Sequence, residues 1–385
     1  MNFNIKKHSI ALAFGTLGLG ISEYMMMGIL PDISLSLGVS IPQGGRLISA
    51  YALGVCAGAP LTVLLARKEP LKRILLALAM IYFAGNALSA LSPGYALLLG
   101  ARFIAGFPHG AYFGIGAIVA GRLAEKGKKT SAVAAMVSGI TVANLLGVPL
   151  GTFLSHSISW RASYSLASLW GIVLFITLWR WVPYQEPLPD HGFREQFRFL
   201  KKPEPWLLIA ATALGNGGIF CWYSYISPLM LEVSGIKAGA LTTVMILAGL
   251  GMVAGNIVSG PLSDRLSPGR VALYTQAFAA AILVLIFFFA PITWASLALL
   301  FAGALCLFAL SAPEQQLLIE NSKGGEMLGA ACAQMAFNLG NALGAWLGAL
   351  PIQAGYGYRY SALPGAACAL LGFFALLIFV RRKKK

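Results

Sequence analysis

Twelve long apolar stretches follow one another along this chain of 385 residues, separated by short polar segments. They fall at residues 9–30, 45–66, 71–92, 95–121, 131–154, 162–182, 206–231, 239–262, 270–290, 294–318, 326–352 and 360–380. Most are close to the about 20 residues that cross a bilayer as a helix. Backbone polar groups in lipid must be satisfied within the segment, so stretches of this length predict helices rather than barrel strands. We therefore expect an all-α membrane protein with twelve transmembrane helices.

The composition excludes a water-soluble globule. Hydrophobic residues make up 58% of the chain and charged residues 11%, and the mean hydropathy is +0.77. A domain of this size could not bury so much apolar surface in its own core. The chain is therefore expected to lie in a membrane.

The positive charges predict the orientation of the chain. Of the 28 Lys and Arg residues, only Arg46, Arg161, Lys237 and Arg359 fall in outer segments if the N-terminus is cytoplasmic, and Arg102 falls inside a stretch. This asymmetry follows the positive-inside rule and places both termini in the cytoplasm. The net charge of +15 then indicates contact with anionic membrane lipid and no nucleic-acid partner.

The longest polar interruption, residues 184–204, divides the chain into two parts with six stretches each. We expect a six-helix bundle at 1–183, a cytoplasmic linker at 184–204 and a second six-helix bundle at 205–385. Within the linker, FREQFRFLKK is either an amphipathic helix on the membrane surface or disordered. The two halves resemble weak copies of one another, which is typical of transporters whose site lies at the midplane between pseudo-symmetric halves.

Glu23 is a lone carboxylate inside the first apolar stretch. Burying an ionised carboxylate in a membrane costs about 2.5 to 3.5 kcal/mol on translocon scales, so such a residue usually faces the protein interior and has a function. We predict that Glu23 carries a proton. Arg102, in the fourth stretch, is expected at the same depth, about 10 Å below the outer surface, where it forms an ion pair with Glu23 and tunes its proton affinity.

His109 lies seven residues further along the fourth stretch than Arg102. Its imidazole titrates in the range over which a membrane pH gradient acts, so it is either a proton relay or a substrate contact. The alternative is structural: His109 and Arg102 cap backbone carbonyls freed by Pro108 and nearby glycines.

Three segments carry a family resemblance: GPLSDRLSPGR at 260–270, RFIAGFPHGAYFG at 102–114 and GITVANLLGVPLGT at 139–152. They resemble the major facilitator superfamily, and within it the twelve-span proton-linked drug:proton antiporter branch. GFPHGAYFGIGAIVA and FALSAPEQQLLIENSKGGEMLGAACAQMAFNLG resemble the AraJ-type, arabinose-efflux-permease-like group. The resemblance covers nearly the whole chain and implies cation-coupled efflux by rocking of two halves.

Two motifs predict gating. Asp264, with Arg265 and Arg270, is expected to latch two neighbouring helices at the cytoplasmic end, or these residues are only positive-inside anchors. In the corresponding loop of the first half, Arg67 stands where the aspartate would fall. Whether that loop forms a latch stays an open question. In the fifth stretch, Gly147, Pro149 and Gly151 indicate close packing and a kink, and in the resembled family such a segment is associated with efflux.

Substrate contacts are expected from polar and aromatic side chains near the midplane, since neutral amides and aromatic faces suit an uncharged, sugar-like or amphipathic drug-like solute. The candidates are Tyr24, Tyr112, Asn144, Asn216, Trp222, Tyr223, Asn256, Gln334, Asn338 and Asn341. Each of them could instead form a hydrogen bond between helices.

Glu314 and Gln315 follow Pro313 in the tenth stretch. Their position near the cytoplasmic end favours a solvated helix terminus or gate over a second coupling acid. The five cysteines show no metal or redox spacing and are expected to be packing residues. No phosphate-binding GxxxxGK[ST] occurs, and no catalytic constellation indicates an enzyme.

The sequence thus predicts a monomeric, multi-pass transporter of the bacterial inner membrane that needs no cofactor or metal. It exports a small solute in exchange for protons by alternating access. An uncoupled facilitator or uptake transporter of the same fold remains open. A membrane sensor or scaffold is remote, because the chain has no output domain.

Overall fold

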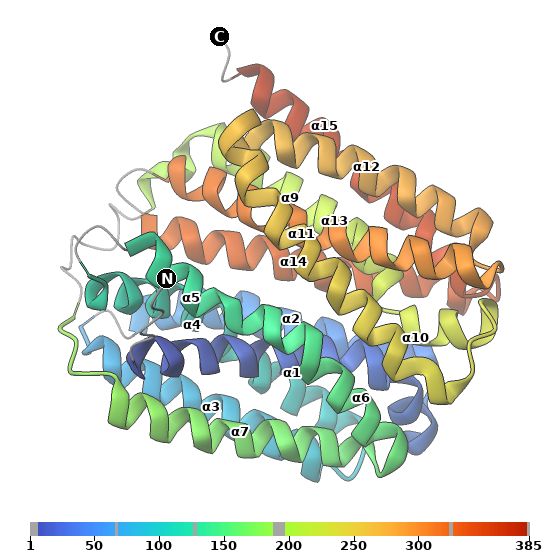
Figure 1. Ribbon diagram of the computed structural model, residues 1–385, viewed down its shortest axis with the longest axis horizontal. Helices are drawn as coiled ribbons and strands as arrows, with labels where there is room; N and C mark the ends of the chain where they lie inside the picture. Colours follow the sequence, from blue (N-terminus) through green and yellow to red (C-terminus); the bar gives the residue numbers. More distant parts are fainter. Residues whose placement is uncertain (1–6, 66–67, 126–128, 188–196, 323–325, 383–385) are drawn as a thin grey trace.

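The computed structural model describes residues 7–65, 68–125, 129–187, 197–322 and 326–382. Among these residues every regular element is a helix, and no strand occurs. The helices of the first half of the sequence, blue to green in Figure 1, lie on one side of the molecule, and those of the second half, yellow to red, lie on the other. The predicted all-α class is confirmed.

The first set of helices packs mostly against itself: α2 contacts α4, α3 contacts α4 and α7, and α1 contacts α5 and α7. Its elements are α1 (Lys7–Leu37), α2 (Ile41–Leu65), α3 (Leu71–Leu91), α4 (Tyr95–Leu123), α5 (Lys129–Val142), the π-helix η1 (Ala143–Gly147), α6 (Val148–Ser157) and α7 (Trp160–Trp181).

The second set is arranged around α9, which contacts α14 and α15, while α11 contacts α13 and α12 contacts α13 and α15. Its elements are η2 (Arg198–Lys201), α9 (Pro203–Tyr223), α10 (Ile226–Pro228), η3 (Leu229–Val233), η4 (Ala238–Ala240), α11 (Leu241–Leu266), α12 (Pro268–Phe289), α13 (Thr293–Glu320), α14 (Glu326–Gln353), η5 (Tyr358–Ser361) and α15 (Ala362–Arg382). Glycines permit the close approach: a Cβ on Gly217 would lie 2.9 Å from the carbonyl oxygen of Gly340. Small residues at helix contacts are typical of membrane proteins.

Ten helical segments among the described residues are long and apolar enough to cross a membrane. The helices α2 and α14 are 25 and 28 residues long but are not among these ten. The chain is thus a multi-pass membrane protein, and the count of twelve spans stays a prediction.

The first helix is longer than its apolar stretch predicts. It passes through Pro31 and ends only where Gly38 adopts a left-handed φ of +62°. There the amide of Val39 donates to the carbonyl of Ser34 and that of Gly38 to Leu35, which is the Schellman arrangement that commonly ends a helix at glycine.

Pro31 leaves one carbonyl of α1 without its usual partner, because proline has no N–H to donate to the residue four positions earlier, Met27. The hydroxyl of Ser227, on α10, donates to that carbonyl instead. Near the C-terminal end of α1, the two sets of helices are therefore joined by a hydrogen bond that replaces the one lost at the proline. They also meet where α2 packs on α14 and where α11 packs on η1 and α6.

Two predicted continuous spans are broken in the structure. The fifth contains the π-helix η1, which ends two residues before Pro149, so the helix is locally widened next to the position of the predicted kink. The seventh ends at Tyr223 and resumes as α10 and η3. Pro228 explains this break, since it cannot donate to the carbonyl of Ser224.

The linker is described only in part, because residues 188–196 lie outside the described ranges. The predicted surface helix FREQFRFLKK falls partly on those residues, and its remainder forms the 3-10 turn η2. Phe199 in this turn is buried against Leu328 and Cys332 of α14. The C-terminal end of the linker therefore packs on α14.

Candidate functional site

A cavity that opens to solvent lies between the two sets of helices. Its walls come from α1, α4 and α5 on one side and from α9, α11, α13 and α14 on the other. The lining residues are Glu23, Tyr24, His109, Phe113, Val137, Ile140, Asn216, Asn256, Leu307, Phe308, Ser311, Gln315, Gln334, Phe337, Asn338 and Asn341. Glu23 is the acidic residue among them.

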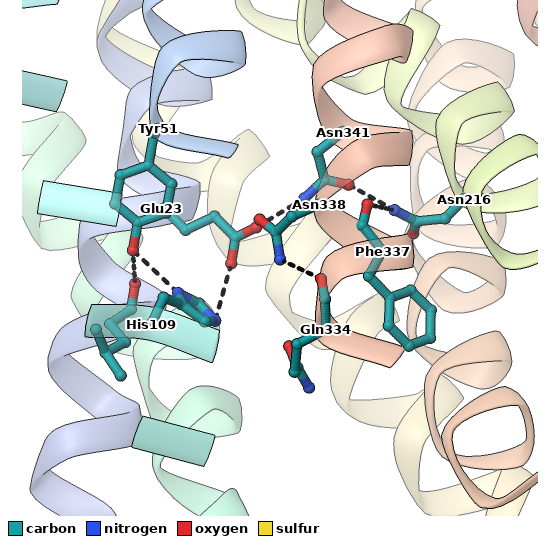
Figure 2. A network of polar contacts seen from close by, with 9 residues as sticks. Glu23, Tyr51, His109, Asn216, Gln334, Phe337, Asn338 and Asn341 are labelled. Carbon is teal, nitrogen blue, oxygen red and sulfur yellow. Dashed lines mark hydrogen bonds and ion pairs between the residues drawn. The ribbon is translucent and has the colours of Figure 1, made fainter. Parts of the chain in front are cut away.

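Glu23 connects the two sets of helices. The residue is 7% exposed, and its Oε1 accepts a 2.7 Å hydrogen bond from the amide of Asn341 on α14. Its Oε2 lies 3.7 Å from Nε2 of His109 on α4. Figure 2 shows the carboxylate between these two partners. Glu23 therefore contacts helices of both sets at once.

The orientation of the Asn341 side chain is set by a second amide. Nδ2 of Asn216, on α9, donates both to Oδ1 of Asn341 and to the carbonyl of Phe337. A backbone carbonyl can only accept, so Asn216 must present its NH₂ group, and Asn341 is left with its own NH₂ facing Glu23. Asn341 is thus held as a donor to the Glu23 carboxylate.

His109 is held on its other side by Tyr51. The Tyr51 hydroxyl lies 3.0 Å from Nδ1 of His109, and the imidazole stacks on the ring of Phe113. His109 is 2% exposed, so one nitrogen meets a hydroxyl and the other faces the carboxylate. These contacts give His109 side-chain partners, in place of the predicted alternative in which it caps a backbone carbonyl.

The predicted ion pair between Glu23 and Arg102 is not formed in this structure. The guanidinium is fully buried, with its carbon atom 4.4 Å from the centre of the Tyr51 ring and 5.4 Å from that of Tyr164. Its Nη1 donates to Ser22 at 3.4 Å, while Nε and Nη2 have no hydrogen-bond partner.

The length of α1 explains this difference. The prediction ended the helix near residue 30, which put Glu23 level with Arg102. Because α1 continues to Leu37, Glu23 lies as many residues before its end as His109 lies after the start of α4 at Tyr95. The two helices run in opposite directions, so the carboxylate meets His109, which lies seven residues further along α4 than Arg102.

Six of the ten predicted substrate residues line the cavity, namely Tyr24, Asn216, Asn256, Gln334, Asn338 and Asn341. The other four do not. Tyr112 donates to the carbonyl of Leu12 at 3.3 Å, between α4 and α1. Asn144 is buried within η1, and both polar atoms of its side chain lack a hydrogen-bond partner.

The remaining two aromatic candidates are packing residues of α9. Trp222 lies against Gly303 of α13, and Tyr223 packs on Phe220 and Trp222. The sequence analysis expected both near the midplane, but Trp222 faces α13 and Tyr223 packs on aromatic residues of its own helix. Correct depth therefore did not ensure the correct face.

The prediction missed the apolar part of the wall together with Ser311 and Gln315. The apolar members are Phe113, Val137, Ile140, Leu307, Phe308 and Phe337. Such residues occur throughout the spans, and no local signal separates them from residues that face lipid. Gln315 carried a signal, a polar amide inside an apolar stretch, but it was assigned to a helix end.

The expected position of Glu314 is wrong. It is fully buried, and α13 continues beyond it to Glu320. Its Oε1 accepts a 2.7 Å hydrogen bond from Gln276 of α12. Glu314 therefore points into the second set of helices and not into solvent at a helix terminus.

The predicted gating residues are placed in part. A Cβ on Gly147 would collide with Ile21, and one on Gly151 with Met25, so the glycines of η1 and α6 do allow close packing on α1. Arg265 and Arg270 are exposed at the end of α11 and the start of α12. The side chain of Asp264 and all of Arg67 lie outside the described residues, and the latches stay predictions.

The described residues contain no group of three or more His, Cys, Asp and Glu side chains that could hold a metal ion. The five cysteines are free thiols, and four of them are buried. An all-helical, multi-pass architecture with a polar cavity between two sets of helices is typical of a membrane transport protein.

Comparison with known proteins agrees with this class. A family model described as Major Facilitator Superfamily matches residues 12–331. The chain belongs to this superfamily, and it is therefore a membrane transporter and not an enzyme.

Similar bacterial proteins extend over almost the whole chain. The AraJ protein of Escherichia coli (strain K12) is 46% identical over 99% of this chain and 97% of its own length. The inner membrane transport protein YdhP of the same strain is 35% identical over 98% of this chain and 96% of its own. The chloramphenicol resistance protein of Streptomyces lividans is 29% identical over 86% of this chain and 86% of its own length.

A solved structure shares the fold. A bacterial homologue of the human lysosomal transporter Spinster, in an inward-facing and unoccupied conformation, superposes with a TM-score of 0.71 over 97% of both chains. At 17% sequence identity, this similarity supports the fold alone.

Proposed function

We propose that this protein exports a small neutral or amphipathic solute in exchange for protons. The observation that carries the proposal is the position of Glu23, a buried carboxylate in the wall of the cavity that contacts α14 through Asn341 and α4 through His109. An acid that bridges two sets of helices is suited to link protonation to their relative movement.

The coupling step follows from the donors and acceptors at Glu23. When the carboxylate is ionised, it accepts the hydrogen bond of Asn341 and faces His109. A proton on Glu23 removes the charge and adds a hydrogen that must find an acceptor, whereas Asn341 presents only a donor. Protonation therefore weakens the link between α1 and α14 and favours separation of the two halves at this point.

Each half consists of six membrane-spanning helices in this proposal, 1–183 and 205–385, joined by the linker 184–204. Both termini lie in the cytoplasm, as the positive-inside pattern predicts. The protein acts as a monomer in the inner membrane of a bacterium, in contact with anionic lipid. Proton coupling needs no cofactor.

The cavity favours access from the cytoplasmic side in this orientation. Val137, Phe113 and Gln315 line it on the cytoplasmic side of Glu23. At the opposite end Ser49 of α2 donates to the carbonyl of Ala342 at 3.0 Å, and Ser227 donates to that of Met27. Alternating access would break these outer contacts and close the inner opening.

The substrate class follows from the wall. The amides of Asn256, Gln334 and Asn338 offer donors and acceptors, while Phe308 and Phe337 offer apolar faces. These groups suit a sugar-like solute or an amphipathic drug-like one. The name of the chloramphenicol resistance protein from Streptomyces lividans supports export of a compound of the second kind.

The test uses purified protein in liposomes loaded with a pH-sensitive dye and a panel of sugars and amphipathic drugs, including chloramphenicol. We expect one of these solutes to drive proton movement in the wild type and not in Glu23→Gln. Glu69→Gln is the matched control, because Glu69 is an exposed carboxylate that pairs with Arg73. Solute flux without proton movement, unchanged in Glu23→Gln, would instead identify an uncoupled facilitator.

A further inference from the structure

A second buried carboxylate lies outside the cavity. Glu314 of α13, Gln276 of α12 and Thr212 of α9 are all fully buried and form one polar cluster within the second set of helices. Ser311 and Gln315, on the same helix, line the central cavity, whereas Glu314 does not. The cluster is therefore separate from the site around Glu23.

Glycines of two helices make the space for this cluster. A Cβ on Gly215 of α9 would collide with the amide of Gln276, and one on Gly372 of α15 would lie 2.9 Å from its Oε1. The Gln276 side chain thus passes between α9 and α15 to reach Glu314. Burying an amide costs free energy unless it is hydrogen-bonded, so an amide here in place of an apolar side chain indicates a specific contact.

The amide orientation of Gln276 is fixed. Its Nε2 donates to the carbonyl of Ala211 at 3.0 Å and to Oε1 of Glu314 at 2.7 Å. The carbonyl can only accept, which assigns the NH₂ group to this side of the amide. The two acceptors then use both hydrogens of that NH₂ group. Gln276 cannot donate to the second oxygen of Glu314.

Three buried oxygens of the cluster have no hydrogen-bond partner: Oε1 of Gln276, Oε2 of Glu314 and Oγ1 of Thr212. The hydroxyl of Thr212 has one hydrogen to offer to the other two atoms. No charged group is among the polar neighbours of Glu314 within the described part of the chain, since these are Thr212 and Gln276. A single added positive charge would supply both the missing donor and the missing neutralisation.

We propose that Glu314 is a second proton-binding site, distinct from Glu23, which takes up and releases one proton in the transport cycle. The inference rests on the proposed proton-coupled function. The step is the formation of an O–H bond at Oε2 with a proton from water, and its reversal, with no other bond changed. Pro313 next to Glu314 leaves the carbonyl of Ala309 without its helical partner, so α13 is less constrained beside the cavity.

The two acids would then answer to different contacts. Glu23 joins α1 to α14 across the two sets of helices, whereas Glu314 joins α13 to α12 within one set. Two such sites predict about two protons moved for each solute, and about one in Glu314→Gln.

The test is infrared difference spectroscopy of the full-length protein in lipid, recorded between acidic and alkaline pH, which detects the C=O stretching band of a protonated carboxyl group. We expect the wild type to lose two buried-carboxyl bands as the pH is raised. Glu314→Gln should lack one of them and Glu23→Gln the other. Glu320→Gln, on the same helix, is the control and should retain both.

Two conservative variants keep the test decisive if Glu314→Gln does not fold. Thr212→Val and Gln276→Leu preserve the acid and change its neighbours, so each should shift the frequency of the Glu314 band and leave the Glu23 band in place. A Glu314 band that persists at every pH would show that this carboxyl group never releases its proton, and would overturn the proposal. Replacing choline chloride by sodium chloride at fixed pH should have no effect, and loss of the band in sodium would identify a sodium site instead.

The two proposals fail in different ways. If Glu23→Gln retains proton-coupled transport, the proposed function fails at Glu23, whatever the infrared result for Glu314. If Glu314 does not titrate while Glu23→Gln abolishes coupling, only the second site is lost.

Discussion

The amide of Asn341 on α14 donates a 2.7 Å hydrogen bond to the carboxylate of Glu23 on α1. These residues are far apart in the sequence and belong to different sets of helices, so this contact joins the two sets in the wall of the cavity. Asn216 fixes the donor, and His109 lies on the other side of the acceptor. Figure 2 shows this row of side chains running from Tyr51 to Asn216.

Replacing the donor should uncouple the transporter. In Asn341→Leu the carboxylate loses a hydrogen bond to a charged group, worth about 1.5 to 3 kcal/mol. We expect the proton-driven rate to fall about tenfold or more in liposomes with an imposed pH gradient. Gln353→Ala, which removes an exposed amide from the end of the same helix, is the control, and an equal loss in both variants would contradict the role of Asn341.

Ser227→Ala should favour opening at the outer end, because it leaves the carbonyl of Met27 without a donor. The loss of about 1 kcal/mol corresponds to about a fivefold change in population. The measurement is labelling of a single cysteine, Ser311→Cys in the cavity, by an impermeant reagent applied from outside, with the native cysteines replaced. The labelling rate should rise severalfold.

The proline in α1 provides a control for that experiment. Pro31→Ala restores the N–H that can donate to Met27. The double variant Pro31→Ala, Ser227→Ala should therefore label at close to the rate of Pro31→Ala alone. A full additional increase from Ser227→Ala in this background would show that the hydroxyl acts in another way.

Gly139→Ala should destabilise the protein. A Cβ at this position would collide with the carbonyl of Ala13 and the hydroxyl of Thr16, and would lie 2.8 Å from the amide nitrogen of Leu17, all on α1. Overpacking of this kind costs about 1 to 3 kcal/mol, and a lower Tm in detergent would report it. Gly114→Ala on α4 is the matched control, because nothing lies within 4 Å of its added Cβ, and a helical alanine there should be neutral or stabilising by up to about 1 kcal/mol.

Gln334→Leu should alter the preference among solutes. Gln334 lines the cavity, and removing its amide would cost a bound hydroxylated solute about one hydrogen bond, or about 1 kcal/mol. We expect a KM about fivefold higher for such a solute and no loss for an amphipathic one. Gln316→Leu is the control, since that amide bonds to Glu320 on the exposed side of α13. An equal effect on both classes of solute would argue against a direct contact.

The site shows where prediction from local pattern stops. The depth argument failed for Glu23 and Arg102 because the first stretch is expected to end near residue 30, whereas α1 continues to Leu37. Glu314 was assigned to solvent because it lies late in its stretch, but α13 is long enough to bury it. Both errors concern the ends of helices, which hydropathy alone defines poorly.

The sequence by itself determined that this protein is a membrane transporter of the Major Facilitator Superfamily, because the length and polarity of its stretches and its motifs are properties of neighbouring residues. It also singled out Glu23, since a carboxylate in an apolar stretch is costly wherever the helix packs. Only the tertiary structure decided that Glu23 meets Asn341 and His109, that Arg102 lies between two tyrosines, and that Trp222 faces another helix. Those contacts depend on helix rotation and register, which arise from packing between segments far apart in the chain.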